Sequence, residues 1–183
     1  MINPLLLFVG KSGSGKTTIA NLLEFPQLQS YTTRPKRYDN ETGHIFISDE
    51  EFDKLEDIIA YTEYNNYRYC ATKQQIDDAL IYVIDVPGVE TLLKKYKTKR
   101  PIIIFYFDST VKTRIDRMIN RHDCDAEIIS RLYNDEANDW FDSLIELVDE
   151  YEVIRDVKLY TINANKEQKN VVRQILYIIE EIN

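Results

Sequence analysis

The sequence predicts an α/β domain in which a parallel sheet is covered by helices on both faces. Short apolar runs alternate with helical patterns along the chain, and this alternation is typical of parallel strands joined by crossover helices. The runs are apolar at consecutive positions, as expected for strands that are buried on both faces. The 183 residues match the size of one domain, so we expect a single domain over residues 1–183.

The clearest strands are predicted where four to six residues in a row are apolar. Leu5–Val9 ends at a glycine, while Ile81–Ile84 and Ile102–Phe107 each end at an aspartate, Asp85 and Asp108. Two further candidates are Lys158–Ile162 and the shorter Gln29–Thr32.

Helical patterns fill most of the chain between these strands. The first helix is expected from Lys16 to Glu24, with Pro26 ending it. The others are expected over Val89–Tyr96, Ser109–Asn120, Ala126–Asp149 and Lys166–Ile182.

The stretch from about residue 29 to residue 75 interrupts this alternation. It contains the short alternating segments Ile45–Ile47 and Tyr67–Tyr69 and a loop-like segment, Tyr38–Gly43. We therefore expect a small lobe inserted into a core made of residues 1–28 and 76–183.

Composition excludes several classes of protein. The net charge is −8, from 23 basic and 31 acidic residues, whereas nucleic-acid binders normally carry a basic surface. No apolar run approaches the roughly 20 residues of a membrane span, and the N-terminus does not resemble a signal peptide. The sequence thus favours a soluble cytoplasmic protein with no nucleic-acid or membrane partner.

Three of the five glycines fall within one octapeptide, Gly10–Thr17, which fits the pattern G-x-x-x-x-G-K-[ST]. We call this octapeptide the phosphate loop, because its backbone N–H groups and the start of the following helix can bind phosphate oxygens. The alternative, a glycine-rich turn without a ligand, fits less well because a buried strand precedes the motif and a helix follows it. The sequence predicts a P-loop NTPase fold with these ATP-binding residues: Gly10, Ser12, Gly13, Ser14, Gly15, Lys16, Thr17 and Thr18.

A magnesium ion is expected beside this loop. The Thr17 hydroxyl is the predicted direct ligand, and Asp85 would hold the water shell of the ion from the end of a neighbouring strand. Asp85 has an alternative role as the carboxylate that ends a strand before the Pro87-Gly88 turn.

A second phosphate site is indicated by the segment from Ser30 to Arg37, which places three cations and four hydroxyls within eight residues. Pro35 favours an extended Arg34, so that neighbouring guanidinium groups can face one phosphate. The alternative is a solvated basic turn.

These residues and their spacing from the phosphate loop resemble the guanylate kinase family, in which an S-x-T-T-R-x-x-R segment holds the phosphate of the acceptor nucleotide. Phe46-Ile47-Ser48 followed by Glu51-Phe52 is similar to another segment of the family, and so is Asp85 with Gly88. The resemblance implies acceptor-binding roles for Ser30, Arg34, Arg37, His44 and Tyr69.

The resemblance extends to the C-terminal third of the chain. It implies a helical lid at about residues 117–135, in which Arg117 packs near adenine while Arg121 and Arg131 reach the phosphates. Asn163 matches a further residue near adenine. The implied activity is transfer of the γ-phosphoryl group from Mg·ATP to GMP or dGMP by a monomer or homodimer, with Lys16, Arg34, Arg121 and Arg131 as the catalytic residues.

Departures from the family pattern concern the acceptor base. The family recognises guanine with a glutamate and a hydroxyl residue; aligning Tyr69 without a gap puts Ala60 and Ala71 at those positions. A shift of three residues would supply Glu63, and Thr72 would replace the hydroxyl one position later. Sequence leaves both alignments open.

Two other family residues are also changed. His44 replaces a tyrosine that holds the acceptor phosphate, and Val83 replaces an aspartate. Tyr61 and Tyr64 either contact a base or only pack across strands. These changes keep open the same reaction on a different nucleotide, while a non-catalytic binding module is less compatible with an intact phosphate loop.

Overall fold

A computed structural model of the chain describes residues 3–37, 39–137 and 140–182. The main sheet is parallel throughout, with the strand order β6-β1-β7-β8. Its strands are β1 (Leu5–Val9), β6 (Ile81–Val83), β7 (Ile102–Asp108) and β8 (Val157–Asn163). Four of the five predicted strands are therefore confirmed in one sheet, close to their expected bounds.

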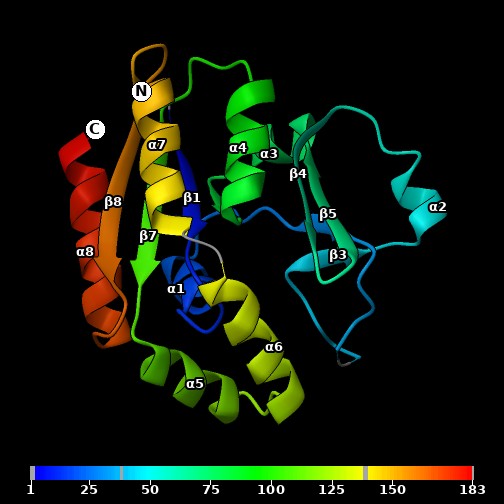
Figure 1. Cartoon of the computed structure of the whole chain (residues 1–183). Helices are drawn as coiled ribbons and strands as arrows, with labels where there is room; N and C mark the ends of the chain where they lie inside the picture. Colours follow the sequence, from blue (N-terminus) through cyan, green and yellow to red (C-terminus); the bar gives the residue numbers. More distant parts are fainter. Residues whose placement is uncertain (1–2, 38, 138–139, 183) are drawn as a thin grey trace.

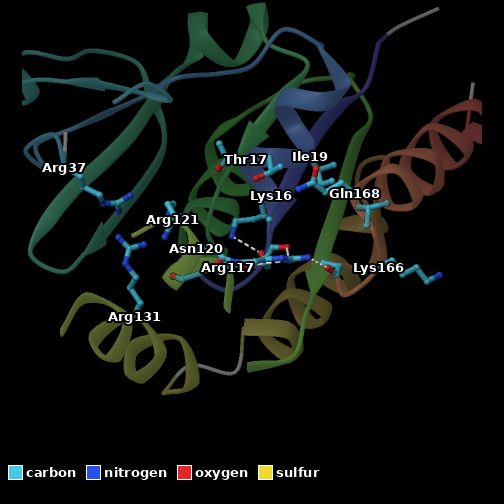
Figure 2. Close-up of a pocket in the computed structure, with 17 residues that line it drawn as sticks. Lys16, Thr17, Ile19, Arg37, Arg117, Asn120, Arg121, Arg131, Lys166 and Gln168 are labelled. Carbon is cyan, nitrogen blue, oxygen red and sulfur yellow. Dashed lines mark hydrogen bonds between the residues drawn. The ribbon is translucent and has the colours of Figure 1, made fainter. Parts of the chain in front are cut away.

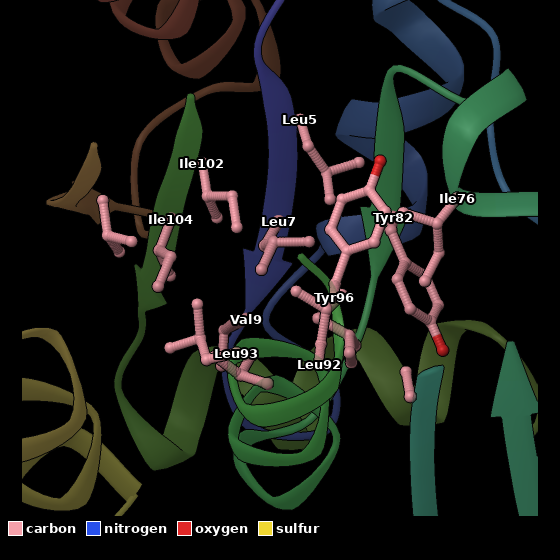
Figure 3. Close-up of a cluster of buried hydrophobic side chains, with 14 of the residues drawn as sticks. Leu5, Leu7, Val9, Ile76, Tyr82, Leu92, Leu93, Tyr96, Ile102 and Ile104 are labelled. Atoms are coloured by element: carbon pink, nitrogen blue, oxygen red, sulfur yellow. The ribbon is translucent and has the colours of Figure 1, made fainter. Parts of the chain in front are cut away.

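Side chains of the main sheet alternate between two hydrophobic clusters. Leu5, Leu7 and Val9 pack in the cluster that includes α4 (Val86–Lys95) and α7 (Trp140–Glu152), as the view of that face in Figure 3 shows in part. Leu6 and Phe8 pack in the other cluster, with α1 (Lys16–Leu23) and α8 (Gln168–Ile182). Helices therefore cover both faces of the sheet (Figure 1).

A second sheet lies beside the first and has the order β3-β2-β5-β4 (Figure 1). Its strands are β2 (Ser30–Thr32), β3 (His44–Phe46), β4 (Ile58–Tyr64) and β5 (Tyr67–Thr72). The pair β2–β3 is parallel, and the other pairs are antiparallel. Gln29–Thr32, predicted as a short strand, thus joins this smaller sheet and not the core.

Short helices flank the second sheet, and both begin with a capping box. α2 (Asp49–Phe52) is capped by Ser48, and α3 (Lys73–Asp78) is capped by Thr72. The predicted loop Tyr38–Gly43 is described at residues 39–43, which lie outside the helices and strands; Tyr38 is outside the described residues.

The prediction of one helix over Ala126–Asp149 is wrong. The structure has α6 (Asp125–Glu136) and α7 as two helices, with residues 138 and 139 outside the described residues. α7 packs on the main sheet through Leu144 and Val148, whereas α6 pairs with α5 (Val111–Asn120) at the end of that sheet (Figure 1). One straight helix could not reach both places. The sequence prediction treats the apolar patterns of two successive helices as the pattern of one.

Loops that follow the strands of the main sheet converge at one edge. The carboxyl ends of β1 and β6 lead into the starts of α1 and α4, and β7 leads into α5 at the same edge. Ligands of open parallel sheets bind at such an edge. In the part of the chain that the structure describes, no helix is long and apolar enough to span a membrane.

Candidate active site

The phosphate loop links β1 to α1 in a conformation that requires glycine. Gly13 has φ 76°, and a Cβ there would lie 2.7 Å from the Arg114 carbonyl oxygen; at Gly10, with φ 147°, a Cβ would lie 2.8 Å from the Phe107 carbonyl oxygen. Gly15 is the N-cap residue of α1, and no side chain caps the N–H groups at the start of this helix. The first turn of α1 has no acidic residue either. The helix start is therefore suited to an anionic ligand.

The Lys16 side chain contacts the backbone of this loop from the start of α1. Its Nζ donates to the carbonyl oxygens of Gly10 at 2.6 Å and Lys11 at 3.0 Å. Burial lowers the pKa of Lys16 to about 8; Asp135 and Asp85 act in the opposite direction, and Arg114 and Arg121 add to the lowering. A bound phosphate would favour the ammonium form by the same Coulomb interaction that the carboxylates provide.

A cavity of about 580 Å³ opens beside the loop and is strongly cationic. Figure 2 shows Arg37, from the loop after β2, and Arg121 and Arg131, from the α5–α6 pair, extending toward the space near Lys16. The pKa of Arg37 is lowered by burial and by the positive charges of Arg131, Arg34 and Arg121. Cations that lower each other's affinity for protons would be stabilised by an anion between them.

Arg34 is held by a carboxylate that the sequence did not single out. Its guanidinium donates to both oxygens of Glu41, at 2.7 and 3.1 Å, and the Glu41 side chain also accepts from the Arg37 N–H at 2.7 Å. Burial opposes this, but the hydrogen bonds from Arg34 and Arg37 lower the pKa of Glu41. Glu41 thus orders the basic segment, and an acid among clustered arginines was the available sequence signal.

The predicted acceptor residues converge at this segment. Ser30 Oγ and His44 Nδ1 lie 2.9 Å apart on paired strands, and the His44 ring contacts the Tyr69 ring at 5.6 Å between centroids. Burial and the Arg34 charge lower the pKa of His44 to about 4, so the imidazole is neutral at pH 7. Arg34, Arg37 and Tyr69 line a cavity of about 430 Å³, and Ser30, Arg37 and His44 line one of about 720 Å³.

Ala60 and Ala71 are directly opposite each other in the β4–β5 pair, and both are buried. Glu63 is exposed on the other face of β4, where it accepts the Tyr61 hydroxyl, and Thr72 serves as the N-cap of α3. The structure therefore does not bring Glu63 and Thr72 together with the other acceptor residues. The ungapped alignment agrees with this geometry, because strand alternation puts Ala60, Thr62 and Tyr64 on one face.

Asp85 has two roles in the structure. Its carboxylate accepts the Gly88 N–H at 2.9 Å as the N-cap of α4, and it accepts the Thr62 hydroxyl at 2.8 Å. Burial raises the pKa of Asp85. Each carboxylate oxygen of Asp85 can accept more than one contact, and the Thr17 side chain lines two of the cavities. The Asp85 carboxylate and the Thr17 hydroxyl are therefore oxygen ligands of the kind that Mg²⁺ prefers.

The two residues predicted near adenine both make hydrogen bonds within the protein. Arg117 donates to the carbonyl oxygens of Ser14 at 2.7 Å and Ala164 at 2.6 Å, while it also lines the 580 Å³ cavity. Asn163 accepts from the Asn165 N–H at 3.1 Å and is not among the residues that line this cavity. The cavity is also lined by Asn120, Lys166 and Gln168, which sequence reasoning did not single out.

Asp135 was also missed, although it contacts the phosphate loop directly. Its carboxylate accepts the Ser12 N–H at 2.7 Å. Ser12, predicted to bind phosphate, therefore has its N–H engaged by α6. An acid four residues after Arg131 was the available signal, since i and i+4 share a helix face.

Comparison with known proteins gives a consistent assignment. No family model matches the chain. A guanylate kinase of Bacteroides thetaiotaomicron is 31% identical, over 70% of this chain and 71% of that protein. The crystal structure of guanylate kinase from Anaplasma phagocytophilum shares the fold, with a TM-score of 0.56 at 15% identity over 98% of this chain and 86% of that chain. By its sequence similarity and its fold, this chain belongs to the guanylate kinase family.

Proposed function

We propose that the protein is an ATP-dependent nucleoside monophosphate kinase. The observation that carries this proposal is the convergence of cations from three parts of the chain on one cavity: Lys16 from the phosphate loop, Arg37 from the inserted segment, and Arg121 and Arg131 from the α5–α6 pair. Transfer between two phosphates requires this concentration of positive charge, because the transition state spreads negative charge over the transferred group.

Each group has a role in that reaction. Lys16 and the N–H groups of the phosphate loop other than that of Ser12 bind the β- and γ-phosphates of ATP. Arg37 and Tyr69 bind the phosphate of the acceptor, and Arg34 joins them while Glu41 holds it in place. Arg121 and Arg131 neutralise charge on the transferred group and exclude water when the nucleotides are bound.

Magnesium would be held by the Thr17 hydroxyl and, through water, by Asp85. When bound, the ion neutralises phosphate charge and orients the γ-phosphoryl group. The hydrogen bonds from Gly88 and Thr62 fix the Asp85 side chain, so its orientation would be set before the ion arrives.

We propose the same division of the chain that the sequence predicts. Residues 29–75, which contain the second sheet, form the acceptor lobe, and the segment of about 117–135 in α5 and α6 forms the lid. The adenine side of the cavity is formed by Arg117, Asn120, Lys166 and Gln168.

GMP and dGMP are the first candidates for the acceptor, because the Bacteroides thetaiotaomicron protein that is similar over most of its length is a guanylate kinase. The buried Ala60–Ala71 pair favours a second candidate, a nucleotide with a different base. A site that lacks a hydrogen-bonding partner for a base loses discrimination for it by orders of magnitude. The phosphate-binding residues are the same in both cases.

A coupled ADP-release assay with Mg·ATP and a panel of ribo- and deoxynucleoside monophosphates tests both candidates. Turnover with GMP and dGMP above all others supports the first, and preference for another base supports the second. Absence of turnover across the whole panel, in a protein that is folded by circular dichroism, would contradict the kinase proposal. Lys16→Ala serves as the inactive control for contaminating kinases.

A further inference from the structure

Three consecutive residues of α6 contact two other parts of the molecule. Asn134 donates to the Asn65 side chain at 2.6 Å, at the tip of the β4–β5 hairpin. Asp135 accepts from Ser12 N–H at 2.7 Å, and Glu136 pairs with Lys11 Nζ at 3.0 Å. We call Asn134, Asp135 and Glu136 the lid anchor, because they join α6 to the phosphate loop and to the hairpin.

Asp135 is the buried centre of the lid anchor. It is 0% exposed, and the Arg114 side chain that pairs with it at 3.1 Å is 1% exposed. Arg114 also pairs with Glu136. Burying a carboxylate costs several kcal/mol unless hydrogen bonds and an opposite charge compensate, and an apolar pair of similar volume is often as stable. Stability alone is therefore a weak reason for a buried ion pair at this position.

The geometry indicates another reason. Arg131 lies one helical turn before Asp135 on α6, so the two share a face of the helix. Arg131 lines both the 580 Å³ and the 430 Å³ cavities. A helix that is bonded to the phosphate loop at Asp135 therefore carries Arg131 at a defined distance from that loop.

α5 is also held against the loop, but through different atoms. Gly13 packs against the Arg114 backbone, and Arg117 donates to the Ser14 carbonyl oxygen at 2.7 Å. These contacts involve α5 alone. The described contacts between α6 and the loop pass through Asp135 and Glu136.

We propose that Asp135 is a positioning residue for phosphoryl transfer: by binding the Ser12 N–H and Arg114, it holds α6 on the phosphate loop and so places Arg131 beside the transferred group. This inference rests on the kinase activity proposed above only for the role of Arg131. The contact between α6 and the loop stands independently of it.

A double-mutant cycle tests the positioning role. Asp135→Asn, which keeps the side-chain volume, is expected to lower kcat between about tenfold and 100-fold, as a misplacement of roughly 1 Å does. In an Arg131→Ala background the same substitution should change kcat less than threefold, because the residue being positioned is absent. Equal losses in both backgrounds would overturn the proposal, since a purely structural role is additive.

Hydrogen–deuterium exchange provides a readout that needs no turnover. Asp135→Asn should speed exchange in the peptide containing Ser12, because the acceptor for its N–H loses its charge. Unchanged exchange there would overturn the proposal. If the wild-type protein shows no turnover, the kinase proposal fails, and exchange still decides whether Asp135 holds the loop.

Two further variants keep the test interpretable. Asp149→Asn makes the same chemical change at an exposed site on α7 and should alter neither kcat nor exchange. If Asp135→Asn does not fold, the pair Asp135→Asn with Arg114→Gln replaces it, because both buried charges are then removed together. That pair should show the same loss of kcat and faster exchange, and wild-type values in it would contradict the inference.

Discussion

The two proposed phosphate sites, one beside each sheet of the molecule, differ in construction. At the edge of the main sheet, the loop after β1 offers backbone N–H groups, and its conformation depends on glycines that pack against Arg114 and Phe107. Beside the second sheet, the proposed site consists of side chains such as Arg34, Tyr69 and His44.

This difference indicates which substitutions would change the specificity of a site. A backbone site is preserved as long as its few glycines and its lysine are preserved. A side-chain site changes its specificity with single substitutions, and the buried Ala60–Ala71 pair is where this chain departs from the pattern it resembles. We therefore expect substitutions to change the choice of base without changing phosphate binding.

The largest effect is expected in the backbone site. Lys16→Ala should lower kcat by at least about 100-fold, because it removes the cation nearest the loop carbonyls of Gly10 and Lys11 while leaving the loop glycines intact. The coupled assay measures the loss, and unchanged thermal unfolding shows that the fold persists. Lys169→Ala, at an exposed lysine of α8, is the matched control. Full activity in Lys16→Ala would remove the basis for comparing the two sites.

In the side-chain site, the ion pair between Glu41 and Arg34 should carry the next largest effect. Glu41→Gln leaves the Arg34 guanidinium buried without its counter-charge, so we expect a loss of about 2–4 kcal/mol in the free energy of unfolding and a higher KM for the acceptor. Chemical denaturation and steady-state kinetics measure the two.

Asp49→Asn, in the same lobe, is the control for that experiment. The Asp49 side chain is 70% exposed in its pair with Arg68, so its loss should cost less than about 1 kcal/mol. Similar costs for the two substitutions would show that burial does not distinguish these ion pairs.

His44 should make the stability of the lobe depend on pH. Its pKa is lowered to about 4 from the ordinary 6.5, so between these values the unfolded chain binds a proton that the folded chain does not. Stability should be full above pH 6.5 and should fall by about 1–3 kcal/mol as the pH drops toward 4. His44→Gln should flatten this part of the profile relative to the wild type, measured by urea denaturation at pH 7 and pH 4.5.

The smallest effect is expected in the discrimination between bases of the acceptor nucleotide. Ala71→Ser restores a hydroxyl at the position where the family has one, so kcat/KM for GMP relative to other monophosphates should rise by about tenfold or less. Ala79→Ser, at another buried alanine, should leave the ratio unchanged. No change in either variant would show that the alanine pair does not face the base.

The main sheet could be predicted almost entirely from local patterns. Consecutive apolar residues indicated β1 and β7, and the octapeptide after β1 indicated the phosphate loop, because both signals lie within a few neighbouring residues. The error over Ala126–Asp149 arose because an apolar periodicity does not report where one helix ends and the next begins when both are amphipathic.

The acceptor side was less predictable. Sequence could not decide between Ala60 and Glu63, because shifting a strand by an odd number of residues changes the face on which a side chain lies. The pairing of Ala60 with Ala71 favours the ungapped alignment, and that pairing joins residues on two strands of a hairpin.

By itself, therefore, the sequence determined the class of fold, the order of its strands along the chain and the phosphate loop, since these follow from residues adjacent in the chain. Only the tertiary structure decided the partners of the buried charges. Glu41 binds Arg34 across a loop, and Asp135 binds Ser12 from 123 positions away. These pairs form because a buried charge without a partner is unfavourable, and a charge becomes buried only when the chain folds around it.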